Sequence, residues 1–175
     1  MVRSLVRQLL GALALMLALA MGVVTGVGAG LAGGVAPALA FEGVDYTLTN
    51  QNEQDFKGRD LADTSFAGAS GRHADFSGAD LHGAIFTQAA FPGANFNGAD
   101  LSNVLMDKVD FSQADFTNAV LQGAIAAGSS FSGATVTNAD FTDALIDRVD
   151  QRALCRDAEG TNPTTGADTR ASLGC

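Results

Sequence analysis

The only two cysteines of the chain, Cys155 and Cys175, lie in its C-terminal stretch LCRDAEGTNPTTGADTRASLGC. Two thiols can form a structural disulfide, act as a redox switch or contribute to a metal site. A zinc site needs further ligands in short motifs, and the sequence has no Cys-x-x-Cys or His-x-x-x-His. In an exported protein, an even count of two is most simply one disulfide. That bond would close a loop of about twenty residues and contribute roughly 3 kcal/mol. A reducible switch that frees the tail is the alternative.

The other residues capable of chemistry do not assemble into a site. His73 and His82 stand at outward positions of the repeat described below, so we expect solvated surface histidines. The motif DAEGTN superficially resembles a calcium loop, but Gly160 is its fourth residue rather than its sixth, and no glutamate closes it. No nucleophile–base pair or phosphate-binding motif is visible. We therefore predict a protein that is not an enzyme, with no catalytic residue, no metal and no cofactor.

The first 40 residues are predicted to be a signal peptide. Arg3 and Arg7 precede an apolar run rich in Leu, Ala and Met, and the segment closes with PALA. This order of positive, apolar and small residues is typical of a secretory signal, with cleavage after Ala40. An uncleaved anchor is the alternative, because the stretch 9–36 is long enough to span a bilayer. Contact with a membrane is expected only through this segment.

The charge of the chain beyond residue 40 is strongly negative. The full sequence has 10 basic and 19 acidic residues, and its formal net charge is −9. All the acidic residues follow position 40, whereas Arg3 and Arg7 precede it, so the exported part has a net charge of −11. A nucleic-acid partner is excluded on this ground, because binding to phosphates needs positive charge. A compact, soluble, acidic domain is the simplest interpretation.

The elements that must position these residues follow from a period of five. From Phe56 to Ile146, every fifth residue is large and apolar except Gly71 and Ala126, and alanine recurs two positions before these central residues. Neither a helix nor a strand keeps every fifth side chain inward over such a length. A coil that turns a corner every five residues does, with glycine-rich corners. Central residues twenty apart also match, as in the Leu61, Leu81, Leu101 and Leu121 column, which predicts four sides per coil.

The segments ADFSG ADLHG, ANFNG ADLSN and ADFTN AVLQG resemble the pentapeptide repeat family, and the resemblance covers roughly residues 54–148. It implies an all-β fold, a right-handed quadrilateral β-solenoid, with coils stacked about 4.8 Å apart. We expect an N-terminal cap segment at 41–53, whose VDYTLTN alternates as a short strand would, and a helical, disulfide-closed tail at 149–175. In this tail, DRVDQRALC predicts one short helix. Asp168 or Thr169 as N-cap and Gly174 as stop predict another helical turn.

The outward residue before each central residue forms a column on each face. Two columns are mostly aspartate, which we attribute to hydrogen bonding of each carboxylate to its own corner, although they could mark a cation or a basic partner. A third column is apolar where polar residues are expected, and an exposed stripe of this kind is usually covered. It consists of Ile85, Leu105, Ile125 and Leu145. Its cover is expected to be either the tail or leading segment, or else a protein partner or a second copy in a homodimer.

The leader, the repeats and the tail together resemble the thylakoid-lumen pentapeptide repeat proteins of oxygenic phototrophs. The resemblance implies an exported, non-enzymatic interaction scaffold or assembly factor in the thylakoid lumen that binds an unknown protein partner through a flat face. The periplasm is the alternative compartment. A DNA-mimicking inhibitor of topoisomerases, as some acidic members are, would suit the charge but not the export signal. A redox-responsive protein gated by Cys155 and Cys175 is the third hypothesis.

Overall fold

The computed structural model describes residues 44–175. The predicted leader and its cleavage position at Ala40 lie outside the described residues. Within 44–175 no helix is long and apolar enough to cross a membrane.

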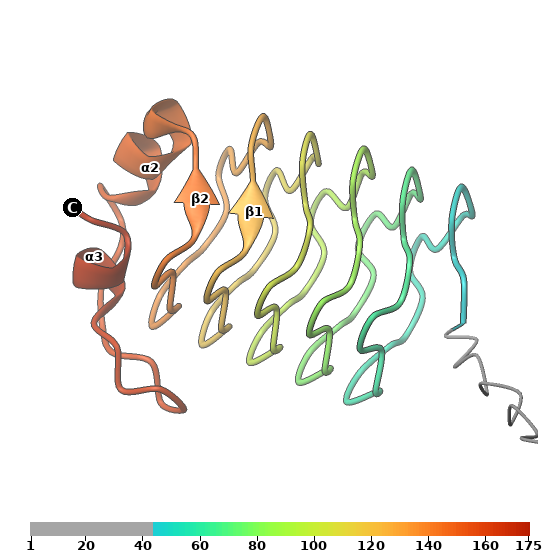
Figure 1. Ribbon diagram of the computed structural model, residues 1–175, viewed down its shortest axis with the longest axis horizontal. Coiled ribbons are helices and arrows are strands. Elements are labelled where there is room, and N and C mark those ends of the chain that lie inside the picture. Colours follow the sequence, from blue (N-terminus) through green and yellow to red (C-terminus); the bar gives the residue numbers. More distant parts are fainter. Residues whose placement is uncertain (1–43) are drawn as a thin grey trace, which may run out of the picture. The chain divides into compact units, whose positions relative to one another are not determined.

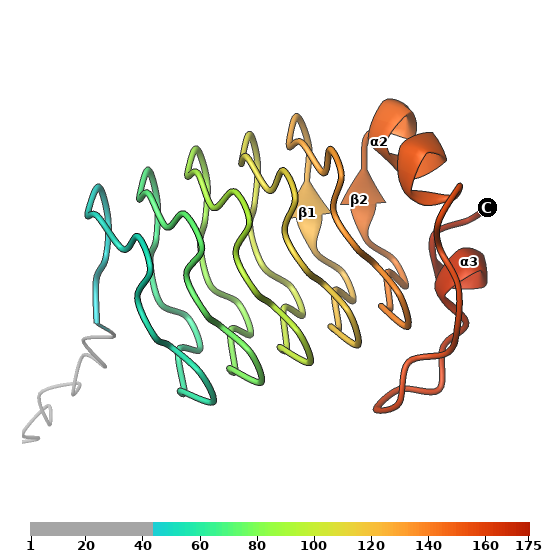
Figure 2. The ribbon, with the colours of Figure 1, turned by 180° about the vertical axis from the view of Figure 1, so that it is seen from behind.

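The backbone winds in coils that stack along one axis (Figures 1 and 2), and the register of the bridges between them gives twenty residues per coil. Every fifth residue from Asp45 onward forms a parallel β-bridge with the residue twenty positions later, beginning with Asp45 to Ser65 and ending with Val120 to Asp140. The fifth turn closes with two short strands, β1 (Ile125–Ala126) and β2 (Leu145–Ile146), which pair in the same register. Four bridges per turn give each coil four sides. At about 4.8 Å per rung, five turns form a stack about 24 Å long.

Each corner is a tight turn that fixes the period of five. The amide two positions before a central residue generally donates to the carbonyl of the preceding central residue, as Ala69 does to Phe66 at 3.0 Å, whereas the amide of Val109 donates to Oγ of Ser129. The third residue of each turn has a positive φ, between 55° and 71° from Leu48 to Asp143. A positive φ at this position is the signature of a type II turn, where glycine and asparagine are the least strained residues. This requirement explains why glycine recurs at a spacing of five.

Corner residues in successive coils also fit one another. A Cβ added to Gly83 would lie 2.4 Å from Oδ1 of Asp63, and one added to Gly123 would lie 2.7 Å from Oδ1 of Asn103. The same holds for Gly93, where the ring of His73 lies 2.6 Å away. At these corners, a side chain of one coil therefore occupies the space left by a glycine twenty residues later.

The core is a set of side-chain columns that run along the stack. Phenylalanine rings twenty residues apart lie nearly parallel, such as Phe76 and Phe96 with centroids 5.0 Å apart, while rings of neighbouring columns meet edge to face. Most of the alanines two positions before the central residues are buried and leave room for these rings, while Ala134 and Ala144 in the last coil are partly buried. Gly71 is part of the same packing, because a Cβ there would lie 2.0 Å from the ring of Phe91. The absence of a side chain at Gly71 therefore makes space for Phe91.

The solenoid begins earlier than the sequence predicted. Asp45 and Asn50 pair with Ser65 and Ser70 in the regular register, and the ring of Tyr46 stacks on Phe66 at 4.9 Å. The expectation of a separate strand-like cap over 41–53 is corrected by these contacts, because the described part of that segment forms the first coil. The period was hidden because Gln51 stands at a central position and because the apolar side chain of Leu48 lies at a corner, 81% exposed.

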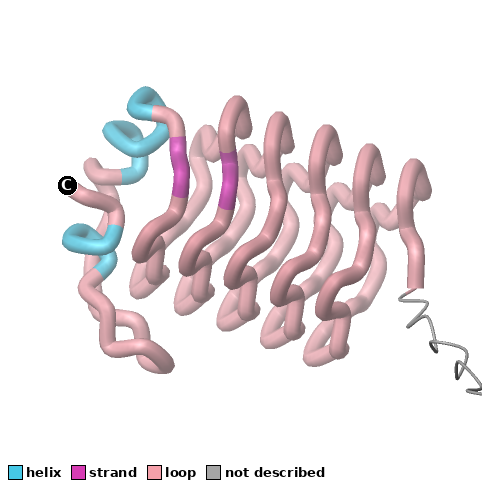
Figure 3. The backbone as a smooth tube through the Cα atoms, in the orientation of Figure 1, coloured by secondary structure: helices cyan, strands magenta, loops and turns pink. Residues whose placement is uncertain are grey.

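The chain leaves the solenoid after β2 and forms two short helices, α2 (Arg148–Leu154) and α3 (Thr169–Ser172). Both lie at the C-terminal end of the stack (Figure 3). Asp168 is the N-cap of α3, since its side chain accepts a hydrogen bond from the amide of Ala171. Leu154 of α2 and Leu173, just after α3, are buried in the core cluster.

Candidate interaction surface

The aspartate columns serve the corners of the solenoid. Oδ1 of Asp75 accepts from the amide of Ser77 at 2.9 Å, and Oδ1 of Asp80 accepts from the amide of His82 at 3.0 Å. The same bond, from a carboxylate to the amide two residues later, recurs at Asp55, Asp60, Asp100, Asp110, Asp115 and Asp140. Each carboxylate therefore stabilises its own turn. Within 44–175, no group of three or more His, Cys, Asp or Glu residues could hold a metal ion.

One face of the solenoid, which we call the apolar face, lacks this carboxylate. Its outward column consists of Ile85, Leu105, Ile125 and Leu145, which follow one another at successive bridges. Leu105 is 37% exposed and Leu145 is 62% exposed, while the two isoleucines are half-buried. The column becomes polar toward the N-terminal end, where Ser65 and Asp45 precede Ile85 in the same register. The structure therefore presents a continuous row of large apolar side chains on a molecule whose other columns are largely polar.

The tail does not cover the apolar face. It docks on the C-terminal edge of the last coil instead, where the amide of Phe131 donates to Asp150 and the amide of Phe141 donates to Oγ of Ser172 at 3.0 Å. The exposure of Leu145 therefore excludes the tail as the segment that covers the apolar face.

Asn162 anchors the tail to the solenoid through hydrogen bonds of its side chain. Its side chain is 1% exposed, and its Nδ2 donates to the carbonyl oxygens of Asn118, Ala119 and Asn138 at 3.0–3.2 Å. Its Oδ1 accepts from the amides of Thr164 and Thr165. Sequence reasoning missed this residue because a single asparagine in a polar loop carries no periodic signal.

Cys155 and Cys175 form a disulfide with a Cα–Cα distance of 5.7 Å. The bond joins the C-cap of α2 to the chain terminus, and Nη1 of Arg170 donates to the carbonyl oxygen of Cys155 at 2.6 Å. The disulfide holds α3, whereas the hydrogen bonds of Asn162 hold the loop before it. The two attachments are separate, so we expect the loop to stay anchored when the disulfide alone is lost.

A buried carboxylate lies beneath this loop. Asp140 is fully buried, and it accepts hydrogen bonds from Thr142 and, at 2.7 Å, from Nε2 of Gln122. Burial by itself raises the pKa of Asp140, but the hydrogen bonds from Thr142, Thr165 and Gln122 outweigh it and lower the pKa below its usual value. Asp140 is therefore ionised near neutral pH and acts as a structural acceptor.

The two histidines stay apart from any such cluster. Nδ1 of His73 lies 3.3 Å from the carbonyl oxygen of Gly93, and His82 is exposed at a corner. Both are therefore surface residues of the corners.

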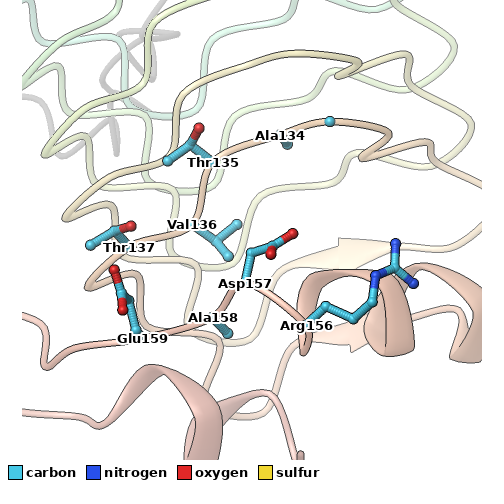
Figure 4. A pocket seen from close by; sticks show the side chains of 9 residues that line it. Ala134, Thr135, Val136, Thr137, Arg156, Asp157, Ala158 and Glu159 are labelled. Atoms are coloured by element: carbon cyan, nitrogen blue, oxygen red, sulfur yellow. The ribbon is translucent and has the colours of Figure 1, made fainter.

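A groove of about 540 Å³ separates the last coil from the segment that follows α2 (Figure 4). One wall is the backbone of residues 133–137, and the other is the segment 156–159. Its lining contains no histidine, cysteine or serine. The groove offers a ligand main-chain groups, the carboxylates of Asp157 and Glu159, the guanidinium of Arg156 and the hydroxyls of two threonines.

A parallel ladder with a period of twenty residues and four corners per turn defines a four-sided β-solenoid that presents flat outward faces. The sequence comparison identifies its kind, because a model of pentapeptide repeats matches residues 55–88, 94–133 and 105–143 in eight copies. The chain belongs to the pentapeptide repeat family, as the repeats predicted. Known structures of this family are right-handed quadrilateral β-solenoids, and its members are generally structural or interaction proteins without enzymatic activity.

Solved structures of the family resemble the chain. A pentapeptide repeat protein from the thylakoid lumen of Arabidopsis thaliana is 37% identical, with a TM-score of 0.73, over 74% of this chain and 90% of that chain. Rfr23 from the cyanobacterium Cyanothece is 16% identical, with a TM-score of 0.54, over 56% of this chain and 80% of that chain. The second likeness shows the fold alone. No curated protein matches the sequence.

Proposed function

We propose that this protein is a non-enzymatic scaffold or assembly factor that binds a protein partner through its apolar face. The observation that carries the proposal is the exposure of Leu105 and Leu145 in a continuous apolar column. A large apolar surface on a soluble protein is stabilised when a partner removes it from water, at about 25 cal/mol per Å² of apolar area. The remaining faces, with their turn-capping aspartates, have no comparable apolar row.

We further propose that the protein acts after export, in the thylakoid lumen. Three observations support this compartment: the signal-like leader, the disulfide between Cys155 and Cys175, and the likeness to a thylakoid-lumen protein that is 37% identical. Disulfides persist in oxidising compartments and are rare in the cytosol. Fractionation of the native host, followed by mass determination of the protein, tests both export and cleavage after Ala40.

The test of the apolar face replaces Leu105 and Leu145 by aspartate in the full chain, expressed with its own leader. The matched control places the same charge at the same repeat position of another face, as Ser70→Asp with Ser130→Asp. We expect the face variant to migrate as the free chain after chemical cross-linking in its compartment, with an unchanged melting temperature, while the control keeps its cross-linked species. An unchanged cross-linked species in the face variant would refute the proposal, and a lower melting temperature would show an internal role for the face.

A further inference from the structure

The regular ladder shows which main-chain hydrogen bonds each coil makes to the next one. On the side that carries Thr135, the amide of Phe116 donates to the carbonyl of Thr135 at 2.8 Å, and the amide of Thr135 donates back to the carbonyl of Ala114 at 3.0 Å. The next rung along the stack would accept from the amide of Val136 and donate to the carbonyl of Ala134. This pair of main-chain groups is therefore the docking edge for one more rung.

No rung is present at this edge. The chain has already turned into α2, and the segment 156–159 passes across the groove. Neither the amide of Val136 nor the carbonyl of Ala134 has a hydrogen-bond partner within residues 44–175. Nearby edge amides are satisfied by the tail, since Asn138 donates to the carbonyl of Glu159 at 2.8 Å and Phe141 donates to Ser172. These two main-chain groups therefore have no protein partner in the described part of the chain and lie at the wall of the groove.

The side chains around the groove favour a basic ligand. In Figure 4 the carboxylate of Glu159 is directed toward Thr137, Asp157 lies in the middle of the groove, and Arg156 lies at its other end, so two carboxylates line the groove against one guanidinium. Asp115 lies one rung below Thr135, in a bridge with it. The inner wall is closed, because Val136 is 2% exposed and Ala158 is 3% exposed. A bound strand can therefore place only small side chains on its inner side, while its outer side lies near the carboxylates.

We propose that this groove binds an extended, basic polypeptide strand, which adds a rung to the solenoid through the amide of Val136 and the carbonyl of Ala134. Addition of a strand to an open edge takes its affinity from main-chain hydrogen bonds and its specificity from alternate side chains. The fitting sequence alternates lysine or arginine with alanine or glycine. This site is separate from the apolar face and does not depend on the function proposed for that face.

The probe is a capped hexapeptide of alternating lysine and alanine, titrated into the full chain with its disulfide intact. Binding is followed by the ¹H–¹⁵N signal of Val136, which we expect to shift and to become protected from hydrogen exchange. Two N-methylated peptides serve as matched controls, one methylated on the lysine amides and one on the alanine amides. Only one edge of a strand faces the groove, so one methylated peptide is expected to bind and the other to lose binding.

The charge is tested separately. Asp157→Asn combined with Glu159→Gln is expected to weaken binding about two- to fivefold, as for exposed ion pairs, while Asp63→Asn at a distant corner leaves it unchanged. A peptide of alternating glutamate and alanine is expected not to bind. Equal binding of both methylated peptides would overturn the main-chain interaction, and equal binding of the acidic peptide would overturn the charge preference. Absence of any Val136 shift at millimolar peptide would overturn the site itself.

Discussion

Replacement of Asn162 should detach the tail from the solenoid. Its side-chain amide donates to three carbonyl oxygens, those of Asn118, Ala119 and Asn138, from a position that is 1% exposed. An amide group has two protons, so one of them is shared between two acceptors. The side-chain oxygen accepts two further amides, from Thr164 and Thr165.

The expected loss of docking free energy in Asn162→Ala follows from the number of these hydrogen bonds. At about 1 kcal/mol net for each of four independent hydrogen bonds, the free energy of docking falls by roughly 3–4 kcal/mol. Asn162→Asp keeps the shape but places a carboxylate oxygen against three carbonyl oxygens. It should cost more than alanine at neutral pH, because a buried anion then has no donor on that side. Protonation relieves the repulsion, so the Asp variant should recover stability as the pH falls.

The assay combines thermal unfolding with hydrogen exchange of individual amides. Faster exchange is expected at Thr164, Thr165 and Asn138, while amides in the middle of the solenoid keep their protection. Asn97→Ala is the matched control, since no hydrogen bond of the Asn97 side chain is found among residues 44–175, and it should change stability by less than about 0.5 kcal/mol. If Asn162→Ala leaves both the melting temperature and these exchange rates at their wild-type values, the hydrogen bonds of Asn162 do not anchor the tail.

Three further outcomes are expected. Reduction, or Cys175→Ser, should lower stability by about 3 kcal/mol and speed exchange in α3 while the loop stays anchored, as measured by melting with and without reductant. Gly71→Ala should cost about 1–3 kcal/mol through its clash with the ring of Phe91, and adding Phe91→Leu should recover part of that loss in denaturant unfolding. The lowered pKa of Asp140 contributes stability above the unfolded value near 3.9 that is lost as the pH falls through the folded value. The melting temperature should therefore be flat from about pH 8 to 5 and fall below about pH 4, less steeply in Asp140→Asn.

The fold was predictable because its signal repeats. Two phenylalanines five residues apart indicate little by themselves. The same spacing over the whole stack excludes a helix and a strand and predicts a coil with a corner every five residues. The match between central residues twenty positions apart then predicts four sides per coil. The apolar column of Ile85, Leu105, Ile125 and Leu145 was visible by the same periodicity. The start of the solenoid was missed, because Gln51 breaks the apolar pattern although the backbone register continues through it.

The tail could not be predicted in the same way. Its helices follow from local signals such as the N-cap Asp168, but its place on the solenoid depends on single contacts between distant residues. Asn162 contacts Asn138, and the main-chain groups at Val136 lack a partner among the described residues, because of the point at which the chain leaves the register of the solenoid. No local sequence pattern predicts that point.

The interlocking corners have a consequence for how such a sequence can change over generations. At Asp63 and Gly83, or Asn103 and Gly123, a bulky substitution of the glycine has nowhere to go unless its partner twenty positions earlier becomes smaller. Substitutions at these corners are therefore expected to be inherited as compensating pairs. In this column large and small corner residues alternate from coil to coil, so loss of one coil would bring Asp63 against Asn103, whereas loss of two coils, forty residues, would keep a large residue next to a glycine.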